Sequence, residues 1–192
     1  MSKSRMEAFS DGVIAILITI MVFEIKVPEG ADLSALMSVV PSLLTFLLSF
    51  LYLGIYWNNH HHMLQLTNRI NGTVLWANLH LLFWLSLLPF VTGWMNRSEM
   101  SRLPVALYGV VLLFAAIAYT ILQSTIIKAE EQDSRLKRAV GSDVKGKISL
   151  AAYVAGLLIA WQLPIASIVI YSGVAVMWFV PDQRIEHQIN MK

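Results

Sequence analysis

Long apolar stretches alternate with short polar segments along most of the chain. The first four stretches are each about twenty residues long, which at 1.5 Å per helical residue is enough to cross a hydrocarbon layer of roughly 30 Å. We expect these helices at residues 9–27, 36–56, 70–90 and 104–127. The pattern predicts an all-α integral membrane protein.

The last apolar stretch, residues 148–180, contains no formally charged residue. It is too long for one crossing unless the helix is strongly tilted. The segment from Trp161 to Pro164 offers a break in its middle, because proline cannot continue a helix normally. We therefore expect two short helices, 148–161 and 164–180, which makes a single domain (1–192) of six transmembrane helices.

The one sizeable aqueous segment that we expect is the loop 128–147, with six Lys or Arg and four Asp or Glu. Cytoplasmic loops of membrane proteins carry an excess of Lys and Arg. With a cytoplasmic N-terminus, six crossings leave only Lys26, Arg97 and Arg102 outside. The cytoplasmic cations are then Lys3, Arg5, Arg69, the six of the loop, Arg184 and Lys192. We expect both termini in the cytoplasm.

Composition supports a membrane protein and excludes several other classes. Hydrophobic residues make up 57% of the chain and charged residues 14%, against roughly 45–50% and 25% in soluble domains. Without cysteine there is no disulfide, thiolate metal site or cysteine nucleophile. The net charge of +2 is too small to indicate a nucleic-acid partner. We expect lipid as a partner and no cofactor.

The first apolar stretch has two unlike faces. At about 100° per residue, one narrow stripe contains Arg5, Phe9, Gly12, Ile16, Ile20, Phe23 and Val27. Asp11 lies roughly opposite, and a carboxylate deep in a bilayer costs at least about 2.5–3.5 kcal/mol. Asp11 is therefore expected near the interface or paired within the protein, with Arg5 as its nearest cation. The stripe either lines something with apolar side chains or is ordinary lipid-facing or packing surface.

The segment from Arg5 to Asp11 resembles the RxxxFSD signature of the transmembrane-protein-175 potassium channels, the lysosomal family with its bacterial relatives. The resemblance extends to the segments Trp57–His61, Trp76–Leu79 and Leu87–Phe90. It covers roughly the first half of the chain and, from Gly93 on, rests on hydropathy and length. It implies a bacterial plasma-membrane channel.

The resemblance also implies roles for individual residues. In that family the first helices surround a pore, and its hydrophobic constriction matches Ile16, Ile20 and Phe23. Its fourfold arrangement implies a homotetramer. A structural network around the signature is expected from Arg5, Phe9, Ser10, Asp11, His60, His61 and Asn78, in which one or two histidines bond to Ser10 and Asp11.

No TVGYG-type segment is present, so a carbonyl selectivity filter is not expected. A hydrophobic constriction instead gates by dewetting, and we expect passive, modest selection of potassium over sodium among monovalent cations. Thr19, about 60° from Ile16 around the helix, adds a hydroxyl ring if the helix rotates slightly. Glu24 either concentrates cations at the outer mouth or is an ordinary solvated interfacial side chain.

Other chemistry has little support in the sequence. The run His60-His61-His62 is not expected to bind metal, because three consecutive helical positions point in different directions. His80 and Asn78, within the third stretch, must find partners inside the bundle. No nucleophile–base pair, phosphate loop or HExxH motif indicates an enzyme. A secondary transporter, or a membrane protein that does not conduct, remains the alternative to a channel.

Overall fold

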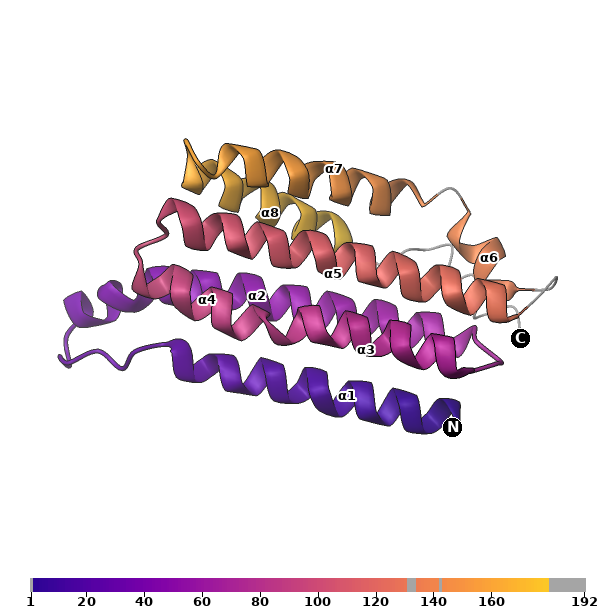
Figure 1. Ribbon diagram of the computed structural model, residues 1–192. Helices are drawn as coiled ribbons and strands as arrows, with labels where there is room; N and C mark the ends of the chain where they lie inside the picture. The colour runs from indigo at the N-terminus through magenta and orange to yellow at the C-terminus, as the bar shows by residue number, and fades with distance from the viewer. Residues whose placement is uncertain (1, 131–133, 142, 180–192) are drawn as a thin grey trace.

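A computed structural model describes residues 2–130, 134–141 and 143–179, and within this part of the chain it contains helices and no strand. The helices are α1 (Lys3–Ile20), the 3₁₀ helix η1 (Met21–Glu24), α2 (Leu33–Gln65), α3 (Gly72–Ser86), α4 (Leu88–Arg97), α5 (Arg102–Ala129), α6 (Arg135–Val140), α7 (Val144–Ile159) and α8 (Pro164–Phe179). The long helices lie side by side, with α1 along one edge and α7 along the opposite edge (Figure 1). The predicted all-α class is confirmed.

Four helical segments are long and apolar enough to cross a membrane: Lys3–Glu24, Leu33–Gln65, Gly72–Arg97 and Arg102–Ala129. They correspond to the first four predicted stretches. Helices α7 and α8 have 16 residues each, or about 24 Å at 1.5 Å per residue, which is short of a roughly 30 Å hydrocarbon layer. The six crossings therefore stay a prediction.

The first helix begins earlier and ends earlier than the predicted 9–27. It starts at Lys3, where the Ser2 hydroxyl caps it by accepting from the Arg5 N–H. The α-helix stops at Ile20 and tightens into η1, which ends at Glu24. Val27, the last member of the predicted stripe, lies beyond both helices.

The second helix corrects two expectations. It continues to Gln65 rather than ending near Tyr56, because several polar side chains of its last turns have partners on neighbouring helices. It begins at Leu33, where the Asp32 carboxylate accepts from the Ala35 N–H at 2.9 Å. The helix therefore starts three residues before the predicted 36, and Pro41 lies inside it, in its third turn.

Two of the breaks between the remaining apolar helices lie just before a proline. Leu87 separates α3 from α4, and Pro89 lies at the start of α4, where a missing N–H is tolerated. A turn at residues 160–163 separates α7 from α8, and Pro164 begins α8, as the sequence predicts. The segment 128–147 contains α6 and the first turn of α7. Val180, Arg184 and Lys192 lie outside the described residues.

The core extends across the whole bundle, from Met6 and Ile14 of α1 to Tyr171 of α8, where small residues leave room for a large ring. Tyr171 of α8 is fully buried. A Cβ added at Gly109 would clash with its hydroxyl, and one added at Gly156 would clash with its ring. The Tyr52 hydroxyl donates to the Tyr171 carbonyl at 2.6 Å. These contacts join α2, α5, α7 and α8 into one unit, against which α1 is held.

Candidate functional site

One face of α1 is buried against the bundle. Met6, Ser10, Ile14 and Leu17 are buried, and Met21 of η1 continues this face. Their spacing of three or four residues matches the 3.6-residue period of a helix. Helix α1 therefore rests on α2 and α3 along one side only, as its position at the edge of the bundle shows (Figure 1).

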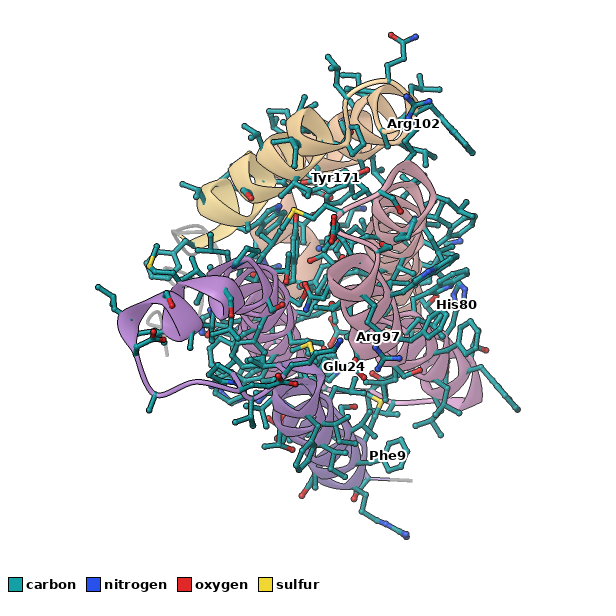
Figure 2. All side chains as sticks on the ribbon, turned by 90° about the vertical axis from the view of Figure 1, so that its left-hand side faces the viewer. Phe9, Glu24, His80, Arg97, Arg102 and Tyr171 are labelled. Atoms are coloured by element: carbon teal, nitrogen blue, oxygen red, sulfur yellow. The ribbon has the colours of Figure 1, made fainter. Side chains whose placement is uncertain are left out.

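The opposite face of α1 is apolar and exposed in the single chain. The exposed fraction is 58% for Ile16, 47% for Ile20 and 84% for Phe23, and Phe9 is also exposed. Figure 2, which looks along the helices, shows Phe9 at the outer edge of the bundle. The residues predicted as a constriction thus share one free surface of the subunit. Arg5 and Gly12, also members of the predicted stripe, are exposed too.

The hydroxyl of Thr19 is exposed on the same helix and turned back to the backbone. Its Oγ1 donates to the carbonyl of Ala15 at 3.1 Å or of Ile16 at 3.0 Å. The hydroxyl proton is therefore satisfied within the helix, and the oxygen lone pairs are left outward.

A buried hydrogen-bond chain attaches α1 to α2 and α3. The Asn78 amide Nδ2 donates to Ser10 Oγ at 2.9 Å, and its Oδ1 accepts from His60 Nε2 at 2.8 Å. Ser10 in turn donates to the Met6 carbonyl at 2.9 Å. Since Asn78 Oδ1 can only accept, the His60 proton lies on Nε2. The buried Nδ1 of His60 has no hydrogen-bond partner among the described residues.

This chain corrects the expected histidine contacts. His60 reaches Ser10 through Asn78 rather than directly. The Asp11 carboxylate accepts from the indole N–H of Trp57 at 3.0 Å, not from a histidine, and no ion pair joins it to Arg5 among the described residues. Trp57 stands in the segment that carries the family resemblance, yet its partner was not apparent from the sequence.

A second polar contact lies at the same end of α1 and α2. The Glu7 carboxylate lies 3.1 Å from His61 Nδ1, and Gln65 lies 2.8 Å from the other ring nitrogen of His61. His61 therefore contributes to the attachment of α1 through Glu7, a residue that the sequence did not single out. Asp11 and His61 are both only partly buried, unlike Ser10, Asn78 and His60.

The far end of α1 is attached by an ion pair. Glu24 of η1 accepts from Arg97 of α4 at 2.7 Å (Figure 2). The carboxylate also packs on Gly93, where an added Cβ would clash with it. Glu24 is thus neither an isolated cation-concentrating charge nor simply solvated, because a neighbouring helix partly neutralises it.

Within the described part of the chain, the histidines outside this network do not belong to a metal-binding cluster. Groups of three or more His, Cys, Asp or Glu side chains that could hold an ion are absent from the described residues. His80 is exposed on α3 and accepts from the indole N–H of Trp84 at 3.0 Å. Of the two polar residues of the third stretch that were predicted to find partners inside the bundle, Asn78 is buried there. His80 lies on the outside (Figure 2).

Comparison with known proteins identifies relatives of this chain. The family model described as the endosomal/lysosomal potassium channel TMEM175 matches residues 5–89. A protein of Chryseobacterium sp. (strain P1-3), named a potassium channel, is 51% identical over 99% of both chains. A Streptomyces collinus protein named a potassium channel is 34% identical over 62% of both chains.

A solved structure has the same fold. It is the crystal structure of a lysosomal potassium-selective channel TMEM175 homologue from Chamaesiphon minutus, with a TM-score of 0.82 and 26% identity. The match covers 94% of this chain and 97% of that one. The identity to the Chryseobacterium protein over nearly the full length, together with the family model and this fold, shows that the chain belongs to the TMEM175 family of potassium channels.

Proposed function

We propose that four copies of this chain assemble around a central axis and conduct potassium passively along the exposed stripe of α1. The single observation that carries the proposal is the division of α1 into a buried face and an apolar face that the chain itself leaves free. One helix cannot enclose a pore, so conduction requires a ring of subunits, and cyclic symmetry closes such a ring. Membership of a channel family excludes an enzyme as the expected activity.

The proposed constriction consists of Ile16, Ile20 and Phe23 from each subunit. Apolar rings of this kind form a barrier by dewetting and strip part of the ion's hydration shell. The dehydration of potassium costs less than that of sodium, and an apolar ring has no oxygen cage that favours sodium. Selectivity for potassium over sodium is therefore modest and follows hydration energy.

The polar contacts of α1 have a structural role in this proposal. Ser10, Asn78 and His60 fix the rotation of α1 near its N-terminus, and Glu24 with Arg97 fixes its other end. Together they determine which face of α1 is free. Arg5 and Phe9 lie at the exposed end of the helix and are proposed to complete the mouth of the pore.

The orientation proposed is N-terminus in the cytoplasm of a bacterium, in the plasma membrane. The start of α1, the end of α2 and the end of α5 lie at one end of the bundle, which gathers Lys3, Arg69 and Lys128 (Figure 1). Arg97 and Arg102 lie at the other end, where α4 meets α5. This distribution follows the excess of cations that cytoplasmic segments carry.

Reconstitution in planar bilayers under bi-ionic conditions tests the proposal. We expect reversal potentials that favour potassium over sodium modestly, with rubidium and caesium passing at least as well as potassium. Strict exclusion of sodium together with rejection of caesium contradicts an apolar constriction. A saturating flux that moves protons in fixed stoichiometry indicates a transporter, and no flux from correctly assembled protein indicates a non-conducting membrane protein.

A further inference from the structure

A cavity of about 60 Å³ lies between α2, α5, α7 and α8, away from the exposed face of α1. Since a water molecule needs roughly 10–15 Å³ measured in this way, the cavity has room for several waters or one compact chemical group. Val140, Asp143 and Gly146 line it where α6 joins α7. The ligand would therefore enter from the same end of the bundle as the start of α1.

Aromatic rings form much of the wall. Tyr56 and Tyr119 meet edge to face with ring centroids 6.0 Å apart, and Tyr153 faces Tyr52 from α7 at 6.3 Å. The faces of such rings carry negative potential and attract a cation within about 6 Å of the ring centre. One cation already uses this property, because the Lys145 ammonium lies 5.6 Å from the centre of the Trp178 ring. The tyrosines add further aromatic rings to the same wall.

The polar groups of the wall match the same class of ligand. Gln123 is only 7% exposed and borders the cavity, and its amide has no hydrogen bond to the described residues. The amide is not among the fully buried atoms without a partner, so water or a ligand in the cavity can reach it. Asn59 borders the same space and uses its Nδ2 on the Ile55 carbonyl, which leaves its Oδ1 as an acceptor.

One acidic residue lines the cavity, and the Lys145 ammonium lies on the Trp178 ring of its wall. Asp143 is the one formally charged residue among the described residues that line it. It caps α7 by accepting from the Gly146 N–H at 3.1 Å and does so with a left-handed backbone, φ 43°. A carboxylate has capacity for several hydrogen bonds, so this cap leaves acceptor sites over.

We propose that this cavity binds a small primary ammonium ion of the alkylamine type. Its N–H groups donate to the carbonyl oxygens of Gln123 and Asn59, its charge lies against the faces of Tyr56 and Tyr119, and Asp143 attracts it at the entrance. The site is separate from the proposed conduction path and does not depend on it.

The position of the site gives the ligand a route to the pore helix. Tyr56 and Asn59 face the cavity from α2, while the neighbouring residues Trp57 and His60 on the same two turns hold α1. An occupant that stiffens this part of α2 therefore acts on the wall that anchors α1. Binding and channel activity are expected to be linked through these turns.

The test measures binding to purified full-length protein with n-butylammonium chloride, using ligand-induced thermal shift and calorimetry at constant ionic strength. n-Butanol is the neutral probe of similar shape. We expect a concentration-dependent shift with butylammonium and little or none with butanol. Gln123→Leu and Asp143→Asn should each weaken binding about tenfold or more, because each removes a hydrogen-bond or charge partner of the ammonium ion. Asparagine retains the cap and tolerates the left-handed backbone.

Two further variants keep the test decisive. Gln123→Glu adds a carboxylate inside the cavity and should strengthen butylammonium binding, even if Gln123→Leu does not fold. Gln162→Leu, in the exposed turn between α7 and α8, is the matched control and should leave binding unchanged. The proposal is overturned if butanol gives an equal thermal shift or if butylammonium does not bind. It is also overturned if the Gln123 variants do not alter the shift, because the ligand then binds elsewhere, for example in the pore.

Discussion

Helices α1 and α5 are both long and apolar, but they have opposite relations to the rest of the chain. In the most apolar part of α5, 50% of the residues are buried, whereas the corresponding figure for α1 is 28%. Helix α5 contacts α3, α4, α7 and α8 and forms the centre of the bundle. Helix α1 is attached by one face and a few polar bonds. Contacts within one chain therefore surround α5, whereas the exposed face of α1 is free to contact another subunit, lipid or the pore.

The largest expected loss of stability comes from the scaffold around α5. Tyr171→Ala removes a fully buried ring between Gly109 and Gly156 and should lower the free energy of unfolding by about 3–5 kcal/mol, as large core truncations do. Tyr171→Phe is the matched control. The Tyr171 hydroxyl is buried without a partner among the described residues, so its removal should be neutral or stabilising. Thermal unfolding in detergent measures both, and equal losses would show that the hydroxyl, not the ring, is essential.

A smaller loss is expected where α1 is attached. Asn78→Leu leaves the buried Ser10 hydroxyl and the His60 N–H without their partner and should cost about 1–3 kcal/mol. Asp11→Ala should cost less, because its partner Trp57 is 45% exposed and water can replace the carboxylate. Asn68→Leu, on the exposed connection before α3, is the control. The same melting assay ranks them, and a larger loss for Asp11→Ala would place the main anchor at Trp57.

The exposed face of α1 should show the reverse pattern, with little effect on stability and a clear effect on conduction. Ile16→Asn should raise conductance and lower ion discrimination, because a polar ring stays wet. Ile14→Asn, two residues earlier on the buried face, should instead destabilise the protein, since it buries an amide without a partner. Single-channel recording and thermal unfolding of both variants test the assignment. Unchanged currents for Ile16→Asn would place this face against lipid.

The smallest expected effect is at the Glu24–Arg97 pair. The Arg97 side chain is 66% exposed, and exposed ion pairs contribute roughly 0.2–1 kcal/mol and weaken with salt. Glu24→Gln should therefore change stability little but alter conductance at low ionic strength, because η1 carries Phe23. The charge-swapped double variant Glu24→Arg with Arg97→Glu should restore the parent conductance. Failure of the swap to restore it, with both single variants folded, would mean that packing on Gly93 is more important than charge.

Much of the fold could be predicted because membrane-spanning helices are long apolar stretches that are easily recognised in a sequence. The apolar stretches, the break before Pro164 and the two faces of α1 follow from hydropathy and a 3.6-residue period. The end of α2 could not be predicted, because the helix continues through Trp57 and His60 only where other helices supply partners. Such partners come from tertiary packing, which periodicity does not report.

The residues of the candidate site were predicted better than the contacts between them. The family resemblance supplied Ser10, His60 and Asn78, and the structure brings them together. It did not supply the order of the bonds, the pairing of Asp11 with Trp57, or the role of Arg97. His80 was expected inside and lies outside, because a histidine can satisfy one nitrogen on its own helix, here with Trp84. The residues around the cavity bordered by Gln123 come from five helices and form no pattern along the chain.

The hydroxyl of Thr19 has a consequence for the sign of the permeant ion. Its only proton is committed to the carbonyls of its own helix turn, so the oxygen presents lone pairs without a hydrogen. In the proposed ring of four chains, these oxygens would form a neutral collar that solvates a cation and offers nothing to chloride. Thr19→Val keeps the shape of the side chain, and a shift of the reversal potential toward chloride in a potassium chloride gradient would reveal this discrimination. The preference for cations over anions at this ring would then come from the backbone geometry of one helical turn and not from a charged side chain.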